Sequence, residues 1–243
     1  MSVVVSISPD FSFSYNEGNV LFSTGGEELC LEKGRIYGLF GPNGVGKTTL
    51  LNVVNTMIKP TTGNIKYLIH DKNYEFNSSS NKLDVDLISN NIRRSFQVPL
   101  LIDEWSALEN IMLIKREYNE ENIRHVFDNK PFLVDDRAQD LLSVVGVSAQ
   151  EKAGNLSYGQ RRLLANLQMI YSEAPLLILD EPFANLHEKI ITVLQDEYKR
   201  ILENQNVTIL VVEHKRNVIE AFADRIISIK DKRLFFEENH VES

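Results

Sequence analysis

A run of eight residues combines three glycines with a lysine and a threonine at a spacing suited to holding phosphate. It fits the pattern G-x-x-x-x-G-K-[ST], is followed by Thr49, and reads Gly41-Pro42-Asn43-Gly44-Val45-Gly46-Lys47-Thr48. Glycines let a loop approach an anion closely, and backbone N–H groups at the start of the next helix attract negative charge. We predict that Lys47 reaches the β- and γ-phosphates of a nucleotide and that the Thr48 hydroxyl coordinates Mg²⁺. The alternative is a glycine-rich turn that merely contains a lysine, which a strand before the run and a helix after it disfavour.

Two adjacent carboxylates, Asp180 and Glu181, directly follow an apolar run. Asp180 is predicted to complete the Mg²⁺ shell. Glu181 is predicted to be the general base that polarises the water attacking the γ-phosphate, because in-line phosphoryl transfer needs a positioned nucleophile. Without the phosphate loop, an Asp-Glu pair after a strand is more typical of a solvated turn or a helix N-terminus.

Three short apolar runs are the elements that have to bring these residues together. Their hydrophobicity is continuous rather than alternating, which is typical of strands in a parallel sheet flanked by helices. The runs are Tyr37–Phe40, Leu176–Leu179 and Thr208–Val212. Polar residues follow each run, beginning at Gly41, Asp180 and Glu213. Because ligands of open α/β sheets gather at the carboxyl ends of the strands, these endings are expected to converge on one site.

Helices are expected between these runs. Helical periodicity of apolar residues extends from Leu50 to Ile58 and from Ile190 to Ile201, whereas the polar stretch Asp71–Asn91 is expected to be a polar loop or excursion. From Pro99 to Glu173 the pattern is mostly helical. The helical segments there are expected near Ser106–Glu117, Asp135–Val145 and Gly159–Tyr171.

These elements predict two structural parts. Residues 1–98 and 174–243 are expected to form an α/β core, and residues 99–173 an inserted helical subdomain.

The composition is that of a soluble globular chain. Its 243 residues include 26 Lys and Arg against 34 Asp and Glu, giving a formal net charge of −8, and 43% are hydrophobic. This acidic balance disfavours binding to the nucleic-acid backbone, so no nucleic-acid partner is expected.

Cys30 is the single cysteine, which favours a reducing, cytoplasmic compartment. The N-terminus does not read as a secretory leader, and no run approaches about 18 apolar residues, so no membrane span is expected.

A further motif, Leu156-Ser157-Tyr158-Gly159-Gln160, precedes the Leu176–Leu179 run. Together with GPNGVGKTT and LLILDEP, it gives nearly the whole chain a resemblance to the nucleotide-binding subunits of ATP-binding cassette (ABC) transporters, whose signature reads LSGGQ. Ser157 supplies a hydroxyl, Gly159 permits close approach, and the following helix offers its N-terminus to an anion. A simple N-cap at Ser157 is the alternative. The resemblance implies an α/β fold with a P-loop NTPase core, a mainly parallel sheet, N-terminal antiparallel strands and the inserted helical subdomain.

The resemblance further implies a Mg²⁺-dependent ATPase that works as a dimer. Two such subunits, in a homo- or heterodimer, would hold ATP between the phosphate loop of one and Ser157, Gly159 and Gln160 of the other. Gln97 resembles the Q-loop glutamine, which senses Mg²⁺ and the attacking water. His214 resembles the switch histidine at the γ-phosphate. Taken alone, a glutamine in a loop and a histidine after a strand are more often structural.

An aromatic residue ahead of the phosphate loop commonly stacks on adenine in this family. Tyr15 is the best-placed residue for that role, because its ring offers apolar area and a π face. Phe11, Phe13 and Phe22 compete with it.

The chain departs from the family pattern at two positions. Tyr158 stands where the signature has glycine, and we expect it to be tolerated because Ser157 and Gly159 remain. His187 stands where an aspartate is usual. Because histidine is neutral or cationic near neutral pH, we hypothesise weakened or pH-sensitive coupling between the two sites of the dimer.

Within the family, Arg94-Ser95-Phe96-Gln97 and the residues from Tyr158 to Arg162 are similar to the ATPases of branched-chain amino acid importers. The expected function is an ATP-binding and hydrolysing subunit, peripheral on the inner face of the cell membrane. It would couple ATP-driven dimer closure to movement of cargo by separate transmembrane permease subunits, which choose the cargo. The alternatives are a soluble ABC-type ATPase acting on a ribosome, DNA or a protein complex, and a nucleotide-dependent scaffold that hydrolyses poorly.

Overall fold

The computed structural model describes residues 3–16, 18–114, 136–144, 146–205 and 207–237, which group into two compact units. Unit 1 comprises Met1–Arg94, Pro175–Glu181 and Leu202–Ser243, and unit 2 comprises Ser95–Ala174 and Pro182–Ile201. The division of the sequence at residues 98 and 174 stays a prediction about domains. The predicted boundaries differ from those of the two units chiefly at residues 182–201, which were expected in the α/β core but belong to unit 2. In the described ranges, no helix is long and apolar enough to span a membrane.

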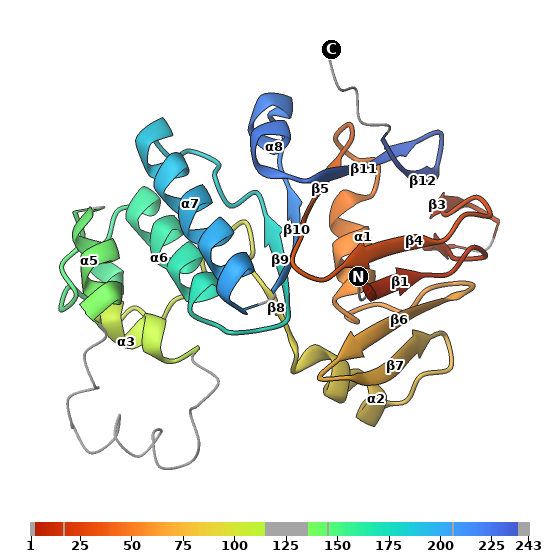
Figure 1. Ribbon diagram of the computed structural model, residues 1–243, viewed down its shortest axis with the longest axis horizontal. Helices are drawn as coiled ribbons and strands as arrows, with labels where there is room; N and C mark the ends of the chain where they lie inside the picture. The colour runs from red at the N-terminus through yellow and green to blue at the C-terminus, as the bar shows by residue number, and fades with distance from the viewer. Residues whose placement is uncertain (1–2, 17, 115–135, 145, 206, 238–243) are drawn as a thin grey trace. The chain divides into compact units, whose positions relative to one another are not determined.

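Unit 1 contains a mixed sheet with a parallel centre (Figure 1). Over the described residues its strand order is β2 (Ser12–Ser14), β3 (Val20–Ser23), β12 (Arg233–Phe236), β11 (Arg225–Lys230), β5 (Ile36–Phe40), β10 (Thr208–Val212), β9 (Leu176–Asp180) and β8 (Ile92–Arg94). The strands from β11 to β8 in this order are parallel to one another. Every residue of β9 and β10 is buried, which accounts for their continuous hydrophobicity. The three strands predicted from the apolar runs are therefore confirmed as β5, β9 and β10.

A second sheet in unit 1 is antiparallel. Its strand order is β4 (Leu29–Glu32), β1 (Val3–Ile7), β6 (Asn64–Ile69) and β7 (Lys72–Asn77). This sheet supplies the N-terminal antiparallel strands that the family resemblance implies, so the α/β fold class is confirmed.

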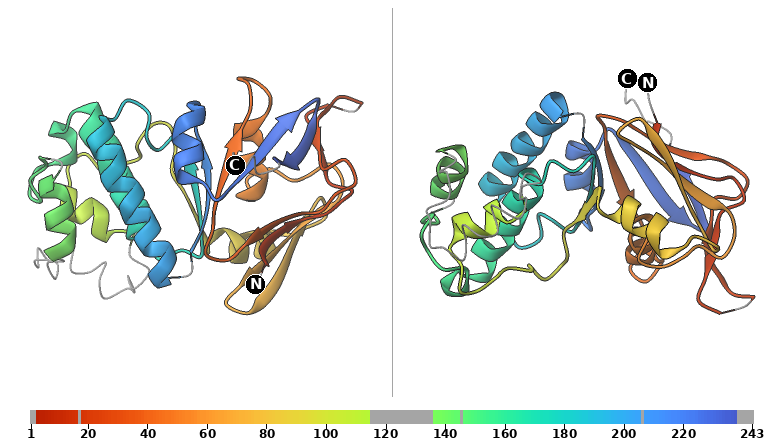
Figure 2. Two further views of the ribbon diagram at one scale, coloured as in Figure 1. Left: turned by 45° about the horizontal axis from the view of Figure 1, so that its top comes forward. Right: turned by 90° about the horizontal axis from the view of Figure 1, so that it is seen from below.

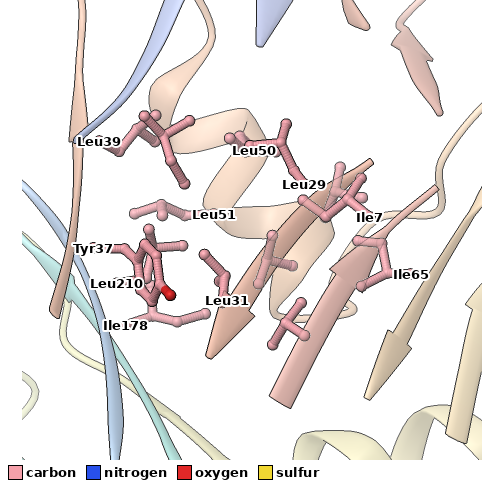
Figure 3. Packing of buried hydrophobic residues seen from close by; sticks show 14 of the residues in the cluster. Ile7, Leu29, Leu31, Tyr37, Leu39, Leu50, Leu51, Ile65, Ile178 and Leu210 are labelled. Atoms are coloured by element: carbon pink, nitrogen blue, oxygen red, sulfur yellow. The ribbon is translucent and has the colours of Figure 1, made fainter. Parts of the chain in front are cut away.

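Helix α1 (Lys47–Val54) lies between the two sheets and forms the centre of the hydrophobic core. Figure 3 shows Leu50 and Leu51 of α1 between two layers of apolar side chains. One layer comes from the parallel strands, with Tyr37, Leu39, Ile178 and Leu210, and the other from the antiparallel sheet, with Ile7, Leu29, Leu31 and Ile65. The core therefore fixes the helix that follows the phosphate loop from both sides.

Helix α8 (Arg216–Phe222) covers the face of the parallel strands opposite α1 (Figure 2). A Cβ on Gly38 of β5 would lie 2.5 Å from Ile219 of α8, so this close approach requires glycine. The neighbours Tyr37 and Leu39 point to the α1 side, as the alternation of a strand demands.

The expected loop over Asp71–Asn91 is wrong, because most of it is regular structure. β7 pairs with β6 through a tight turn at His70 and Asp71, whose φ angles are 48° and 61°, and α2 (Lys82–Ser89) follows. Asn81 starts α2 with a capping box to Asp84. The polar composition of the segment reflects exposure of one face of each element, and only the Asn and Ser residues between them form a loop.

The helical segments predicted between Pro99 and Glu173 correspond to α3 (Ala107–Met112), α5 (Asp136–Val144) and α6 (Tyr158–Ile170) of unit 2. The same unit contains the 3₁₀ turn η1 (Ala153–Asn155), which was not predicted, and the first part of α7 (Glu188–Gln205), which matches the periodicity from Ile190 to Ile201. Residues 115–117 of the first predicted helix, and Asp135 and Val145 of the second, lie outside the described residues. Ser106 and Ser157 begin α3 and α6 with capping boxes, which explains where these helices start.

The end of α1 yields a prediction about stability. The buried Tyr67 hydroxyl of β6 donates to the carbonyl of Val54, the last residue of α1, at 2.7 Å. Burial raises the pKa of this phenol, so it stays a donor. Tyr67→Phe leaves a helix-end carbonyl unsatisfied and is expected to lower the free energy of unfolding by about 1–2 kcal/mol. Urea unfolding followed by circular dichroism measures this. Tyr74→Phe, at the half-exposed register partner on β7, is the control and should stay within about 0.5 kcal/mol of the native protein.

Candidate nucleotide-binding site

The phosphate loop connects the end of β5 to the start of α1 in unit 1. Gly44 and Gly46 have φ angles of 77° and 107°, which favour glycine. A Cβ on Gly46 would also meet Leu21 and Phe22 at 3.0 Å. Gly46 is the N-cap of α1 and has no side chain to bond the first amides, so these remain available to an anion.

Lys47 places its amine inside this loop. Its Nζ donates to the carbonyls of Gly41 at 2.7 Å and Pro42 at 2.9 Å, and the side chain is buried. Burial lowers the pKa of Lys47, and the charges of Glu181 and Asp180 partly oppose this shift. A phosphate at the loop would supply acceptors of higher charge than the two carbonyls.

Glu181 and His214 form a hydrogen-bonded pair where β9 and β10 end. The Glu181 amide donates to the Val212 carbonyl at 3.0 Å, and Glu181 has a φ of 53°, a conformation unusual for a residue with a side chain. Its Oε1 lies 2.5 Å from Nε2 of His214. A carboxylate accepts hydrogen bonds, so the tautomer of His214 with its proton on Nε2 suits this contact. The parallel register of β9 and β10 thus brings together two residues that lie far apart in the sequence.

Asp180 ends β9 as a buried carboxylate. Its Oδ2 forms an ion pair with Arg94 of β8 at 3.1 Å, and Arg94 also donates to Asn52 of α1. Sequence reasoning did not find Arg94 or Asn52 as site residues. A buried arginine indicates an ion pair. The burial of Arg94 becomes evident only once β8 is paired with β9.

The oxygen donors near the loop fit Mg²⁺. This ion commonly takes one or two protein oxygens together with phosphate oxygens and water. The exposed Thr48 hydroxyl and the Asp180 carboxylate are ligands of that kind. Among the described residues, no group of three His, Cys, Asp or Glu side chains forms an all-protein metal site. A single hydroxyl and a single carboxylate suit a cation that arrives with a nucleotide, because phosphate oxygens and water complete its coordination.

Tyr15 is the exposed aromatic residue in the segment before the loop. Its ring is 66% exposed and packs edge-on against Phe13, with ring centroids 4.9 Å apart. Its hydroxyl lies 2.8 Å from the hydroxyl of Thr49 on α1. Phe11, Phe13 and Phe22 are buried in the core and would have to leave it to stack on a base.

The signature motif belongs to unit 2, where its residues begin α6. The Ser157 hydroxyl accepts from the Gln160 amide at 3.4 Å, and the Gln160 side chain accepts from the Ser157 amide at 3.0 Å. This is the N-cap arrangement that the sequence left open as an alternative. A Cβ on Gly159 would meet no described atom within 4 Å, so packing within unit 2 does not require this glycine.

Gln97, also in unit 2, is joined to the signature helix through its backbone. Its carbonyl accepts from the Tyr158 hydroxyl at 3.1 Å and from Nη1 of Arg162 at 3.0 Å, and Arg162 also donates to the Tyr158 hydroxyl. The Gln97 side chain lies in an exposed bend. The tyrosine that departs from the family signature therefore has a defined contact, and its tolerance stays a prediction.

His187 lies in an exposed segment before α7, where its Nδ1 accepts from the Lys189 amide at 3.4 Å. The hypothesis of pH-sensitive coupling through His187 stays a prediction.

The fold and the loop geometry define a nucleotide-binding α/β protein, and comparisons with known proteins specify the family. The ABC transporter profile matches residues 26–184. The chain is 29% identical over 217 residues to the high-affinity branched-chain amino acid transport ATP-binding protein BraF of Pseudomonas aeruginosa, covering 86% of this chain and 82% of BraF. It is 28% identical over 220 residues to the phosphonates import ATP-binding protein PhnC of Fusobacterium nucleatum, covering 87% of this chain and 84% of PhnC.

A solved structure shares the fold. The dimeric ATP-binding cassette MJ0796, in a post-hydrolysis state bound to ADP and Pi, aligns with a TM-score of 0.71 at 24% identity, covering 96% of this chain and 98% of that one. Since the family profile spans more than half of the sequence, the chain belongs to the ABC transporter family. The resemblance to the ATPases of branched-chain amino acid transport is confirmed as well.

The contacts around the Gln97 carbonyl yield a second prediction. Arg162→Met removes the charged donor to this carbonyl and is expected to lower the unfolding free energy of unit 2 by about 2–3 kcal/mol. Tyr158→Phe removes one neutral hydroxyl and is expected to cost about 0.5–1 kcal/mol. Urea unfolding followed by the fluorescence of Trp105, the single tryptophan, reports on unit 2. Equal costs for the two substitutions would contradict the assignment of Arg162 as the main donor.

Proposed function

We propose that the chain is the Mg²⁺-dependent ATPase subunit of an ABC transporter, acting at the inner face of the membrane. One observation carries the proposal: the phosphate loop, the Asp180 carboxylate and the Glu181–His214 pair all lie at the ends of adjacent parallel strands of unit 1. This arrangement provides the three requirements of phosphoryl transfer, which are an anion cradle, oxygen ligands for a cation, and a base for water.

The residues of unit 1 divide the reaction among them. The loop amides and Lys47 bind the β- and γ-phosphates of ATP, while Thr48 and Asp180 hold Mg²⁺. Bound Mg²⁺ offsets charge on the phosphates and orients them for in-line attack. Glu181 accepts a proton from the attacking water, and His214 orients Glu181 through its 2.5 Å hydrogen bond. The left-handed backbone at Glu181 supports this assignment, because such strain is typical of functional positions.

A second ATP-binding subunit completes the proposed site. Its Ser157, Gly159 and Gln160 would face the nucleotide held by the loop of the first, and Gln97 would monitor Mg²⁺ and water. The open space beside Gly159 supports this role, because a partner or a phosphate can approach the start of α6 there.

Separate permease subunits are proposed as the membrane partners. The names of BraF and PhnC support coupling to transport, and that of PhnC supports import. These two relatives are named for different cargoes yet are almost equally similar to this chain. Cargo choice is therefore assigned to the permease and capture subunits.

Glu181→Gln tests the hydrolytic role. It keeps the shape of the side chain but removes the base, so we expect ATP hydrolysis to fall at least ~100-fold while ATP affinity changes less than about threefold. Phosphate release at saturating MgATP and equilibrium ATP binding measure the two quantities. Glu188→Gln, at an exposed position starting α7, is the matched control. Comparable phosphate release by the native and Glu181→Gln chains would favour a poorly hydrolysing scaffold instead.

Tyr15 yields a prediction about base recognition. Tyr15→Ala removes the stacking ring and is expected to weaken ATP binding about 10-fold, whereas Tyr15→Phe keeps the ring and stays within about twofold. Inorganic triphosphate has no adenine base to stack on Tyr15, so its affinity should be unchanged in both variants. Native ATP affinity in Tyr15→Ala would mean that another group holds the adenine.

A further inference from the structure

Arg94 is a buried charge that phosphate binding and water activation do not use. It ends β8, and its side chain and that of its ion-pair partner Asp180 are only 3% and 4% exposed. Burying two charges carries a large desolvation penalty, which their attraction offsets only with good geometry and further hydrogen bonds. Such a pair is weak evidence for stability alone, so its placement calls for another explanation.

The guanidinium of Arg94 connects three elements of unit 1. Its Nη2 contacts Oδ2 of Asp180 on β9 at 3.1 Å, and its Nη1 donates to Oδ1 of Asn52 on α1. The sheet register explains the first contact. Arg94 is the partner of Ile178, and Asp180 lies two residues further on the same face of β9. Because Ile178 packs in the core with Leu51 of α1, this face is the one that α1 covers.

The position of Asn52 on α1 relates this contact to the proposed Mg²⁺ ligands. Asn52 comes four residues after Thr48, so the two side chains lie one above the other on the same side of the helix. Arg94 therefore contacts Asp180, which is one of the two proposed Mg²⁺ ligands. It also contacts Asn52, which lies one helical turn after Thr48, the other proposed ligand. A single rigid group connects the two elements that supply the oxygen ligands.

We propose that Arg94 is a positioning residue for the Mg²⁺ site, which fixes the spacing between Asp180 and the Thr48 end of α1. The inference rests on the proposed function. The planar fork of arginine suits this task, since two nitrogens donate in fixed directions at once. A lysine at this position keeps the positive charge but supplies one flexible ammonium, so substitution by lysine separates geometry from charge.

The test measures ATP binding over a range of Mg²⁺ concentrations and in a chelator, using the full chain. In Arg94→Lys, the Mg²⁺ concentration that half-maximally strengthens ATP binding is expected to rise about 10-fold, the usual size of effect for a group that orients a metal ligand. ATP binding in the chelator should stay within about twofold of native, because the loop is untouched. Asn52→Ala should shift the Mg²⁺ dependence in the same direction. Combining the two substitutions should add less than the sum of the single effects, because both break one connection.

Ile92→Ala is the matched control, because Ile92 is a buried residue of the same strand with no polar contact to Asp180. It should lower the melting temperature without moving the Mg²⁺ dependence. If Arg94→Lys does not fold, Asn52→Ala carries the test alone, since it leaves the ion pair in place.

Two results would overturn the inference. One is a native Mg²⁺ dependence in both Arg94→Lys and Asn52→Ala. The other is equal weakening of ATP binding with and without Mg²⁺, which would mark Arg94 as a support of the whole fold. If ATP binding by the native chain does not respond to Mg²⁺ at all, the proposed function itself is wrong and the inference falls with it.

Discussion

The site in unit 1 depends on holding opposite charges close together while removing much of the water around them. Asp180, Arg94 and the Glu181–His214 pair occupy the ends of neighbouring strands, and Lys47 begins the helix that follows β5. Most of these side chains are buried or half-buried. Such charges are stable only when each has a partner of fixed geometry. Parallel strands meet this constraint, because their carboxyl ends align at one edge and residues from distant parts of the sequence meet there.

The hydrophobic core offsets the free-energy cost of burying these charged side chains. A buried lysine, a buried ion pair and a left-handed Glu181 all work against folding. Helix α1 offsets them by burying Leu50, Leu51, Val53 and Val54 between two sheets. The same packing fixes the helix whose first residues bind phosphate. The antiparallel sheet therefore contributes to the site without supplying a ligand, because without it one face of α1 would be uncovered.

Local sequence signals were enough to find the phosphate loop, the three central strands and the carboxylate pair. Each is encoded within a few residues by glycine spacing or by a continuous apolar run. Contacts that depend on register were out of reach. Arg94 becomes a neighbour of Asp180 only when β8 pairs with β9. The β7 and α2 segment was misjudged because half-exposed elements carry polar residues that resemble a loop, although the pattern of Tyr74 and Phe76 alternates as a strand should.

Tyr158, one of the two departures from the family pattern, has defined hydrogen-bond partners in the structure. Tyr158 replaces a residue without a side chain, and its hydroxyl joins Arg162 in binding the backbone carbonyl of Gln97. In this chain the start of the signature helix is therefore connected by direct hydrogen bonds to the segment proposed to sense Mg²⁺ and water. A displacement of Gln97 would change the environment of Tyr158, the residue between Ser157 and Gly159. A glycine at that position has no side chain with which to make this hydrogen bond, so the contact to the Gln97 carbonyl depends on the tyrosine.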